Sequence, residues 1–553
     1  MLANHPFNQR VSGFFSLSAG NLVILAAFNS LLLNLLNKTQ PLWPQMDNLS
    51  GAKHFLVNQT DDYYTNSLMN SPRIFTIAIL KVFALIFHAQ VETIIAILGV
   101  LINIFGPPLF IMAVNGEMDQ IKNRKATTIP LVAAFTLITI LNMDILHKIE
   151  VNGFFINPFS QGATTSNLAF VIFLIGIIAA RNYIRIPMFI LSLLIHISTF
   201  LYLFILFAAA KNMRSWKFKI RKKPIITSVC IAIIVLLFLT MEHMNEDGWK
   251  YYVENRAPNH FVISTSTPEI LRFALWALFG LSLIFNLVAK HKRCTLIFLG
   301  VATLTIFFSA YHYYALPFAI GFICMALNIA VRSVAYTTFS LLFLLLLQDF
   351  PIDSISVATS MLLPGTRYVA IVTFYLLTTF LFGIYAKFNK PSFDRLVFTK
   401  FTRPYKAMIG MLIFSTLVCT FLSSKVAVSN FEILGNTIPS FSSREEIVNR
   451  DLIFLDVSSQ GWREFGNFSI FVDEYPFWGN LTEYKKRAIF RSRLVSLIEK
   501  GELNSDRLRS VQAQFNVHQE ITLVSSRRNA KELSNLPCLS RHEILLCDLG
   551  MKN

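Results

Sequence analysis

Charged residues are scarce in this chain. Asp, Glu, Lys and Arg make up 15% of its 553 residues, whereas soluble domains carry about 25%. Apolar residues make up 54%, and the mean hydropathy is +0.53. This composition argues against an ordinary soluble protein, and we expect most of the chain to lie in a membrane.

Several signatures of soluble enzymes are also missing. The C-terminal part contains no G-x-G-x-x-G, no P-loop and no Ser/His/Asp hydrolase elbow, so nothing indicates a bound nucleotide. The chain has six cysteines, and none of their spacings with histidine resembles a zinc site. The formal charge of +17 accompanies no recognisable nucleic-acid-binding motif, so we expect no nucleic-acid partner.

Long apolar runs fill the chain up to residue 425. A helix needs roughly 20 apolar residues to cross the bilayer core, and we count about twelve runs, several of them shorter than that. They predict an α-helical polytopic membrane bundle of about 11–13 transmembrane helices. The runs are 14–36, 93–114, 128–143, 167–180, 187–210, 225–241, 270–289, 295–310, 315–330, 335–347, 368–385 and 407–422.

Basic residues gather in three loops between these runs, at 211–223, 290–293 and 387–406. Such loops are typical of the cytoplasmic side, where they also contact anionic lipids. This orientation places five loops outside: 37–72, 144–166, 242–269, 311–314 and 349–367. It also places the C-terminal domain, residues 426–553, outside. We expect a multi-pass protein of a bacterial inner membrane.

One part of the chain does not fit a simple alternation of membrane crossings. The basic segments 181–185 and 211–223 both appear cytoplasmic, yet only the run 187–210 lies between them. We therefore predict that this run is a broken or re-entrant pair of helices, with a turn near 196–198.

The C-terminal domain, residues 426–553, is predicted to be a small extracytoplasmic α/β domain. The pattern predicts helices at 482–500 and 505–515, the second with a serine cap, and a short helix at 529–533. Strands are expected at 452–457, 468–472, 520–524 and 543–548. The alternation suggests a Rossmann-like layered unit. Cys538 and Cys547 form the only cysteine pair in the domain, and we expect a disulfide rather than two buried thiols.

The predicted outer loops hold the candidate site residues. Asp61 and Asp62 form an acidic pair that could act as a general base or hold a divalent cation. The alternative is that both aspartates have a structural role only and cap a surface helix. An amphipathic stretch, 74–88, follows Arg73. Four further residues could bind a phosphate or pyrophosphate; they are Arg73, Arg256, His260 and Arg367.

The long first outer loop with Asp61 and Asp62, the amphipathic segment after it and the C-terminal extracytoplasmic domain together resemble the GT-C superfamily of integral-membrane glycosyltransferases. That resemblance implies membrane lipid contact and a polyprenyl-phosphate-linked sugar donor at the outer face, with a first-loop aspartate as base or metal ligand. A polysaccharide polymerase or ligase would rely instead on the arginines and His260. A transporter is disfavoured because runs such as 225–241 and 335–347 are almost free of polar residues.

Overall fold

The computed structural model describes about two fifths of the chain. The described residues are 73–122, 159, 162–179, 182–212, 403–437, 451–457, 462, 470–472, 481–517, 521–531, 538–541 and 544–549, with pieces of 26–30, 49–53, 371–379 and 533–537. The chain divides into two compact units. The first contains Met1–Gln40, Ile97–Thr227 and Pro258–Lys425, and the second contains Pro41–Ala96, Ser228–Ala257 and Val426–Asn553.

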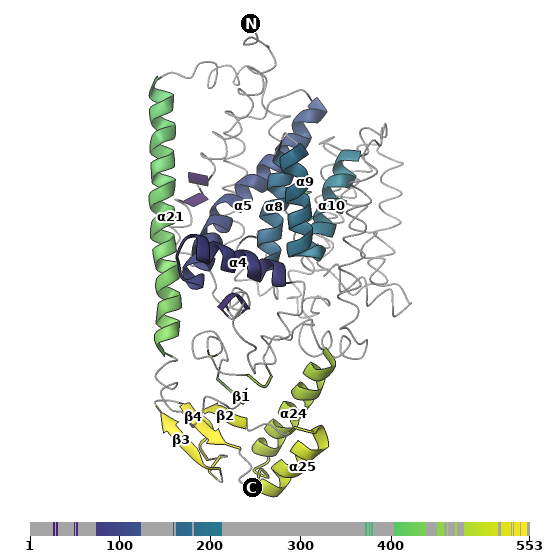
Figure 1. Ribbon diagram of the computed structural model, residues 1–553, viewed down its shortest axis with the longest axis vertical. Helices are drawn as coiled ribbons and strands as arrows, with labels where there is room; N and C mark the ends of the chain where they lie inside the picture. Colours follow the sequence, from purple (N-terminus) through teal and green to yellow (C-terminus); the bar gives the residue numbers. More distant parts are fainter. Residues whose placement is uncertain are drawn as a thin grey trace, which may run out of the picture. The chain divides into compact units, whose positions relative to one another are not determined.

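Helix α5 (Val91–Lys122) is the longest apolar element that the structure describes (Figure 1). Its segment Val91–Val114 has a mean hydropathy of 2.4. Among the described residues, this is the one helix whose length and composition suffice to cross a membrane. It coincides with the predicted run at 93–114.

Two consecutive prolines interrupt the hydrogen bonding of α5. Pro107 and Pro108 lie inside the helix and cannot donate N–H groups to the carbonyls four residues earlier, those of Asn103 and Ile104. The side-chain amide of Asn29 donates to both of these carbonyls, at 2.8 Å and 3.0 Å. Asn29, 2% exposed, therefore replaces the two missing backbone donors.

The predicted break within 187–210 is confirmed. Helix α9 (Asn182–Ile195) ends one residue before α10 (Ile197–Asn212) begins, and His196 separates them. The rings of Phe189 and Phe200 lie 6.5 Å apart, whereas eleven residues of continuous helix would separate them by about 16 Å. The chain therefore folds back at His196.

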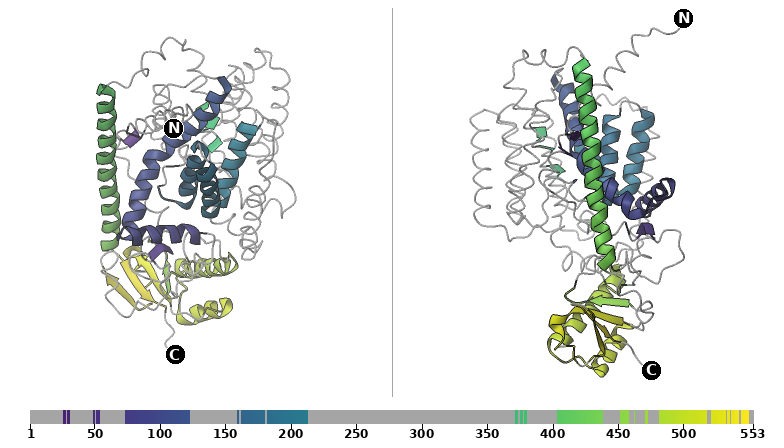
Figure 2. Two further views of the ribbon diagram at one scale, coloured as in Figure 1. Left: turned by 45° about the horizontal axis from the view of Figure 1, so that its top comes forward. Right: turned by 90° about the vertical axis from the view of Figure 1, so that its left-hand side faces the viewer.

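Helix α8 (Thr165–Ile178) completes a three-helix group with α9 and α10, and the three lie side by side in Figure 2. Phe173 of α8 joins them, because its ring contacts Phe189 of α9 and both Phe200 and Phe207 of α10. The Ser192 hydroxyl donates to the Ala169 carbonyl at 2.8 Å. The contacts among these three helices are thus mainly aromatic, and the Ser192 hydroxyl between them is hydrogen-bonded.

Helix α21 (Arg403–Thr437) is continuous over 35 residues. It includes the predicted run at 407–422 and passes through the predicted domain boundary at residue 425. The boundary between the two compact units also falls there, between Lys425 and Val426. The helix therefore carries the chain from one unit into the other without a loop at that point.

The second unit contains a mixed four-stranded sheet in the order β1-β2-β4-β3. Its strands are β1 (Asp451–Phe454), β2 (Ile521–Ser526), β3 (Cys538–Arg541) and β4 (Ile544–Asp548). β1 and β2 are parallel, but β4 is antiparallel to both β2 and β3. Ile470, in the strand predicted at 468–472, forms a parallel bridge with Leu452.

Helices α24 (Leu481–Glu499) and α25 (Ser505–Phe515) pack on one face of this sheet. Their apolar side chains form a core with Ile453, Leu523 and Leu545. The opposite face carries Phe454, Val524 and Leu546, and Trp462 packs there. A Rossmann unit has a parallel sheet, so that prediction is wrong for the described sheet, in which β4 is antiparallel to its neighbours.

Two local predictions in this domain are also wrong. Helix α25 has the predicted bounds, but its cap is Asn504, whose Oδ1 accepts the N–H of Arg507 at 2.9 Å. The short helix predicted at 529–533 is a 3₁₀ turn, η4 (Arg527–Asn529), that directly continues β2.

Candidate functional site

Arg73 is the one predicted catalytic or phosphate-binding residue that the structure describes. It lies half-buried immediately before helix α4 (Ile74–Ile86), and its carbonyl accepts the first helical hydrogen bond, from Ile77, at 3.0 Å. The other predicted residues lie outside the described residues; they are Asp61, Asp62, Arg256, His260 and Arg367. How the predicted site residues lie relative to one another therefore stays a prediction.

Helix α4 differs from the prediction in character. The stretch 74–88 was predicted to be amphipathic, but the helix has large apolar side chains on its exposed side as well as its buried side. Ile77 and Leu80 are buried, while Val82 is 49% and Ile86 is 63% exposed. Lys81 is its sole charged residue.

An ion pair lies where α5 begins. Lys53 Nζ contacts Glu92 Oε1, and both side chains are more than three-quarters buried. The helical piece at 51–53 also approaches α4, because a side chain in place of Gly51 would collide with Ile77. The pair thus ties this piece to the first turn of α5 beside α4. Sequence reasoning did not single out this pair, whose members are 39 positions apart in the chain.

A second polar cluster lies at the carboxyl ends of the parallel strands β1 and β2. Asp456 Oδ1 accepts the Ser525 hydroxyl at 2.9 Å and the Ser526 N–H at 2.8 Å, and Oδ2 accepts the Ser526 hydroxyl. Partial burial by itself raises the pKa of Asp456, but these bonds outweigh it and lower the pKa below 3.8. The carboxylate therefore stays charged and joins the two strand ends.

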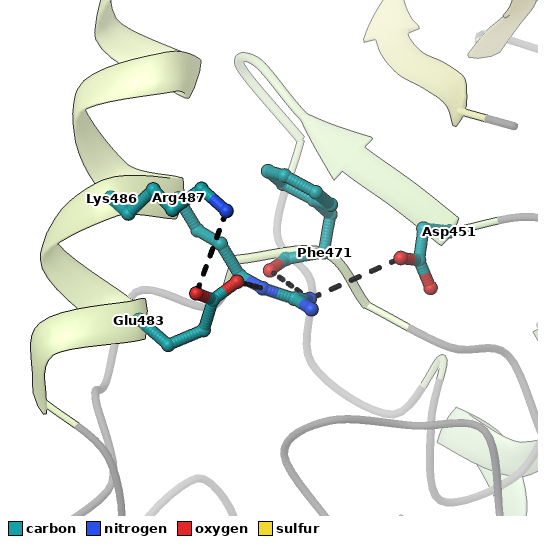
Figure 3. A network of polar contacts seen from close by, with 5 residues as sticks. All are labelled: Asp451, Phe471, Glu483, Lys486 and Arg487. Carbon is teal, nitrogen blue, oxygen red and sulfur yellow. Dashed lines mark hydrogen bonds and ion pairs between the residues drawn. The ribbon is translucent and has the colours of Figure 1, made fainter. Parts of the chain in front are cut away.

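Two arginines of α24 anchor the helix to β1. Arg491 donates to the Phe454 carbonyl through Nε at 2.9 Å and Nη2 at 2.8 Å. Arg487, four residues earlier, is 7% exposed. Its guanidinium contacts Glu483 at 3.0 Å, the Phe471 carbonyl at 3.1 Å and Asp451 at 4.0 Å (Figure 3). It also lies 4.7 Å from the Phe471 ring centroid. These contacts bind Arg487 to groups of the domain itself, so its role is to support the domain.

Cys538 and Cys547 are joined by a disulfide in the structure. They face each other in the register of β3 and β4, with Cα atoms 4.0 Å apart. Cys547 is fully buried in the core shared with α24 and α25. The bridge therefore holds the edge strand β3 to the domain core. Cys419, on α21, is free and half-buried.

Within the described part of the chain, no group of three or more His, Cys, Asp or Glu side chains could hold a metal ion. The divalent cation considered for Asp61 and Asp62 concerns residues outside that part. No protein-family model matches the chain, and no curated protein matches it.

Proposed function

We propose that the chain is a polytopic membrane glycosyltransferase. It transfers a sugar from a polyprenyl-phosphate-linked donor at the outer face of the membrane, in the assembly of a cell-surface glycan. The observation that carries the membrane part of this proposal is the distribution of side chains around α21.

Helix α21 presents several large apolar side chains to its surroundings. Met411, Phe414 and Phe421 are 71%, 69% and 68% exposed, whereas Ser424 is 8% exposed. Soluble proteins rarely expose so many large apolar side chains together, and such a surface marks contact with a membrane or a partner. Burying one such large side chain is worth about 1.5–3 kcal/mol, so three of them favour a lipid environment by on the order of 5 kcal/mol.

The chemical part of the proposal rests on the first outer loop. A carboxylate of Asp61 or Asp62 takes the proton of the acceptor hydroxyl, directly or through a bound cation. Arg73 or Arg256 stabilises the charge that grows on the leaving phosphate. The segments that carry these four residues, Pro41–Ala96 and Ser228–Ala257, belong to the same compact unit as the C-terminal domain.

The decisive experiment measures sugar incorporation by membranes that contain the protein, with a radiolabelled polyprenyl-phosphate sugar as donor. Loss of a general base costs roughly 10²–10⁴-fold in rate, so Asp61→Asn or Asp62→Asn should lose product while insertion is unchanged. Asp47→Asn, at the third acid of the same loop, is the matched control and should retain activity.

Near-normal activity in the Asp61→Asn/Asp62→Asn double variant would refute this assignment. If activity were then lost only in Arg256→Ala and His260→Ala, a polysaccharide polymerase or ligase would be favoured.

The orientation of the chain in the membrane has a separate test. Because α21 continues to Thr437, alkaline phosphatase fused after that residue should be active, and a fusion within 211–223 inactive. The reverse pattern would remove the outer-face chemistry.

A further inference from the structure

Helix α4 has apolar side chains on every side, although only one side packs against the protein. Thr76, Ile77, Leu80 and Ala84 are buried. The other side exposes a continuous set of large apolar residues, which comprises Phe75, Val82, Phe83, Leu85, Ile86 and the following Phe87. A helix that is apolar all round belongs in a protein core or a membrane. The exposed side therefore needs a second apolar neighbour.

The connection to α5 determines which neighbour is available. Four residues separate Ile86, the end of α4, from Val91, where the candidate spanning segment begins. The chain turns there through His88, which adopts a left-handed conformation with φ of 48°. The connection between the two helices can therefore reach at most about 14 Å. This keeps the exposed side of α4 close to the first residues of a segment suited to cross a bilayer.

The length of α4 excludes a second crossing. Its 13 residues extend about 20 Å, shorter than the roughly 30 Å hydrocarbon core. The ion pair of Lys53 with Glu92 lies beside its end, and charged groups favour the boundary over the centre of a bilayer. Length and charge together fit a helix that lies along the membrane boundary.

We infer that the acyl chains of the outer leaflet cover the exposed side of α4, so that α4 is embedded along the membrane boundary. The inference rests on the proposed membrane insertion of α5 and its orientation. The long side chains of Arg73 and half-buried Lys81 reach from this depth to anionic lipid headgroups.

Spin-label accessibility in proteoliposomes tests this placement. Single cysteines replace Val82 or Ile86 in the full chain, after the four cysteines outside the disulfide are changed to alanine. Leu98, half-buried in α5, reports on insertion of α5, and Glu499, exposed at the end of α24, reports on water. Labels at Val82 and Ile86 should favour oxygen over a water-soluble nickel complex, at about 5–10 Å below the lipid phosphates. The label at Glu499 should show the reverse.

The outcomes separate the inference from the proposed function. Nickel accessibility at Val82 and Ile86, with oxygen accessibility at Leu98, would overturn the placement of α4 and leave membrane insertion intact. Nickel accessibility at Leu98 too would overturn both. Dipolar broadening between labels at Ile86 of two molecules would mean that a second copy, rather than lipid, covers this side of α4.

Discussion

Asn29 is expected to be a principal stabilising residue of the first compact unit. Its amide bonds the carbonyls of Asn103 and Ile104, which Pro107 and Pro108 leave without backbone donors. The variant Asn29→Leu keeps the number and branching of the side-chain heavy atoms but removes both N–H donors. Its effect therefore reports on the two hydrogen bonds more than on packing.

The magnitude follows from two limits. An unsatisfied buried acceptor in a soluble protein costs about 1–3 kcal/mol, which gives roughly 2–6 kcal/mol for two. Hydrogen bonds between membrane helices average about 0.6 kcal/mol, with a maximum near 1.7. The two carbonyls have no helical alternative, so we expect a loss of about 2–3 kcal/mol in the free energy of unfolding.

A double-mutant cycle separates this effect from packing. Replacing Pro107 and Pro108 by alanine restores two N–H groups that can bond Asn103 and Ile104 within the helix. In that background Asn29→Leu should cost at least about 1.5 kcal/mol less than in the parent chain. Unfolding in mixed micelles, titrated with a denaturing detergent and followed by circular dichroism, measures all four proteins. Equal losses in both backgrounds would refute the reasoning.

Three further predictions concern other described residues. Gly106→Ala should lower the stability by about 1–3 kcal/mol, since the new Cβ would lie 2.7 Å and 2.9 Å from carbons of a buried phenylalanine ring. Nothing in the described part of the chain lies within 4 Å of the position that a Cβ at Gly410 would take, so Gly410→Ala should raise the stability by about 0.5–1 kcal/mol. Thermal unfolding of the two variants compares these effects. Arg487→Ala should lower the stability of the C-terminal domain by about 3 kcal/mol because a buried carboxylate loses its cation, and exposed Arg493→Ala should change it by less than about 0.5 kcal/mol; equal losses in urea titrations would contradict this. The pKa of Asp456 in the folded state lies below its ordinary 3.8. Its contribution to the free energy of unfolding is therefore present above about pH 4 and is lost as the pH falls through the folded-state pKa. In urea titrations at a series of pH values, Asp456→Asn should make stability depend less on pH on the acid side.

The elements predicted best are those with strong local signals. Helices α24 and α25 agree with their predicted bounds to within one residue, and strands β2 and β4 overlap theirs. The break at His196 was predictable because charge in two loops demanded an additional reversal. In each case the information lies within a short window of the sequence.

The missed features depend on contacts between distant positions. Strand β3 has a short sequence with no strong alternation, and it forms by pairing with β4. The mixed sheet follows from the same pairing, which sequence periodicity does not specify. Asn29 acts on carbonyls 74 and 75 positions away. The predicted site residues other than Arg73 fall outside the described residues, so that part of the sequence reasoning stays a prediction.

The interior of the first unit and the exposed side chains of α21 both concern the exclusion of water. In water, carbonyls freed by a proline pair can bond solvent, so a dedicated donor gives little advantage. Where water is excluded, each freed carbonyl needs a protein donor, and neighbouring helices supply it. Asn29 supplies two such donors. On α21, Phe414 and Phe421 are exposed, which an apolar solvent favours. Exclusion of water from the protein interior accounts for the amide at the proline break, and the proposed immersion in lipid accounts for the exposed apolar side chains of α21.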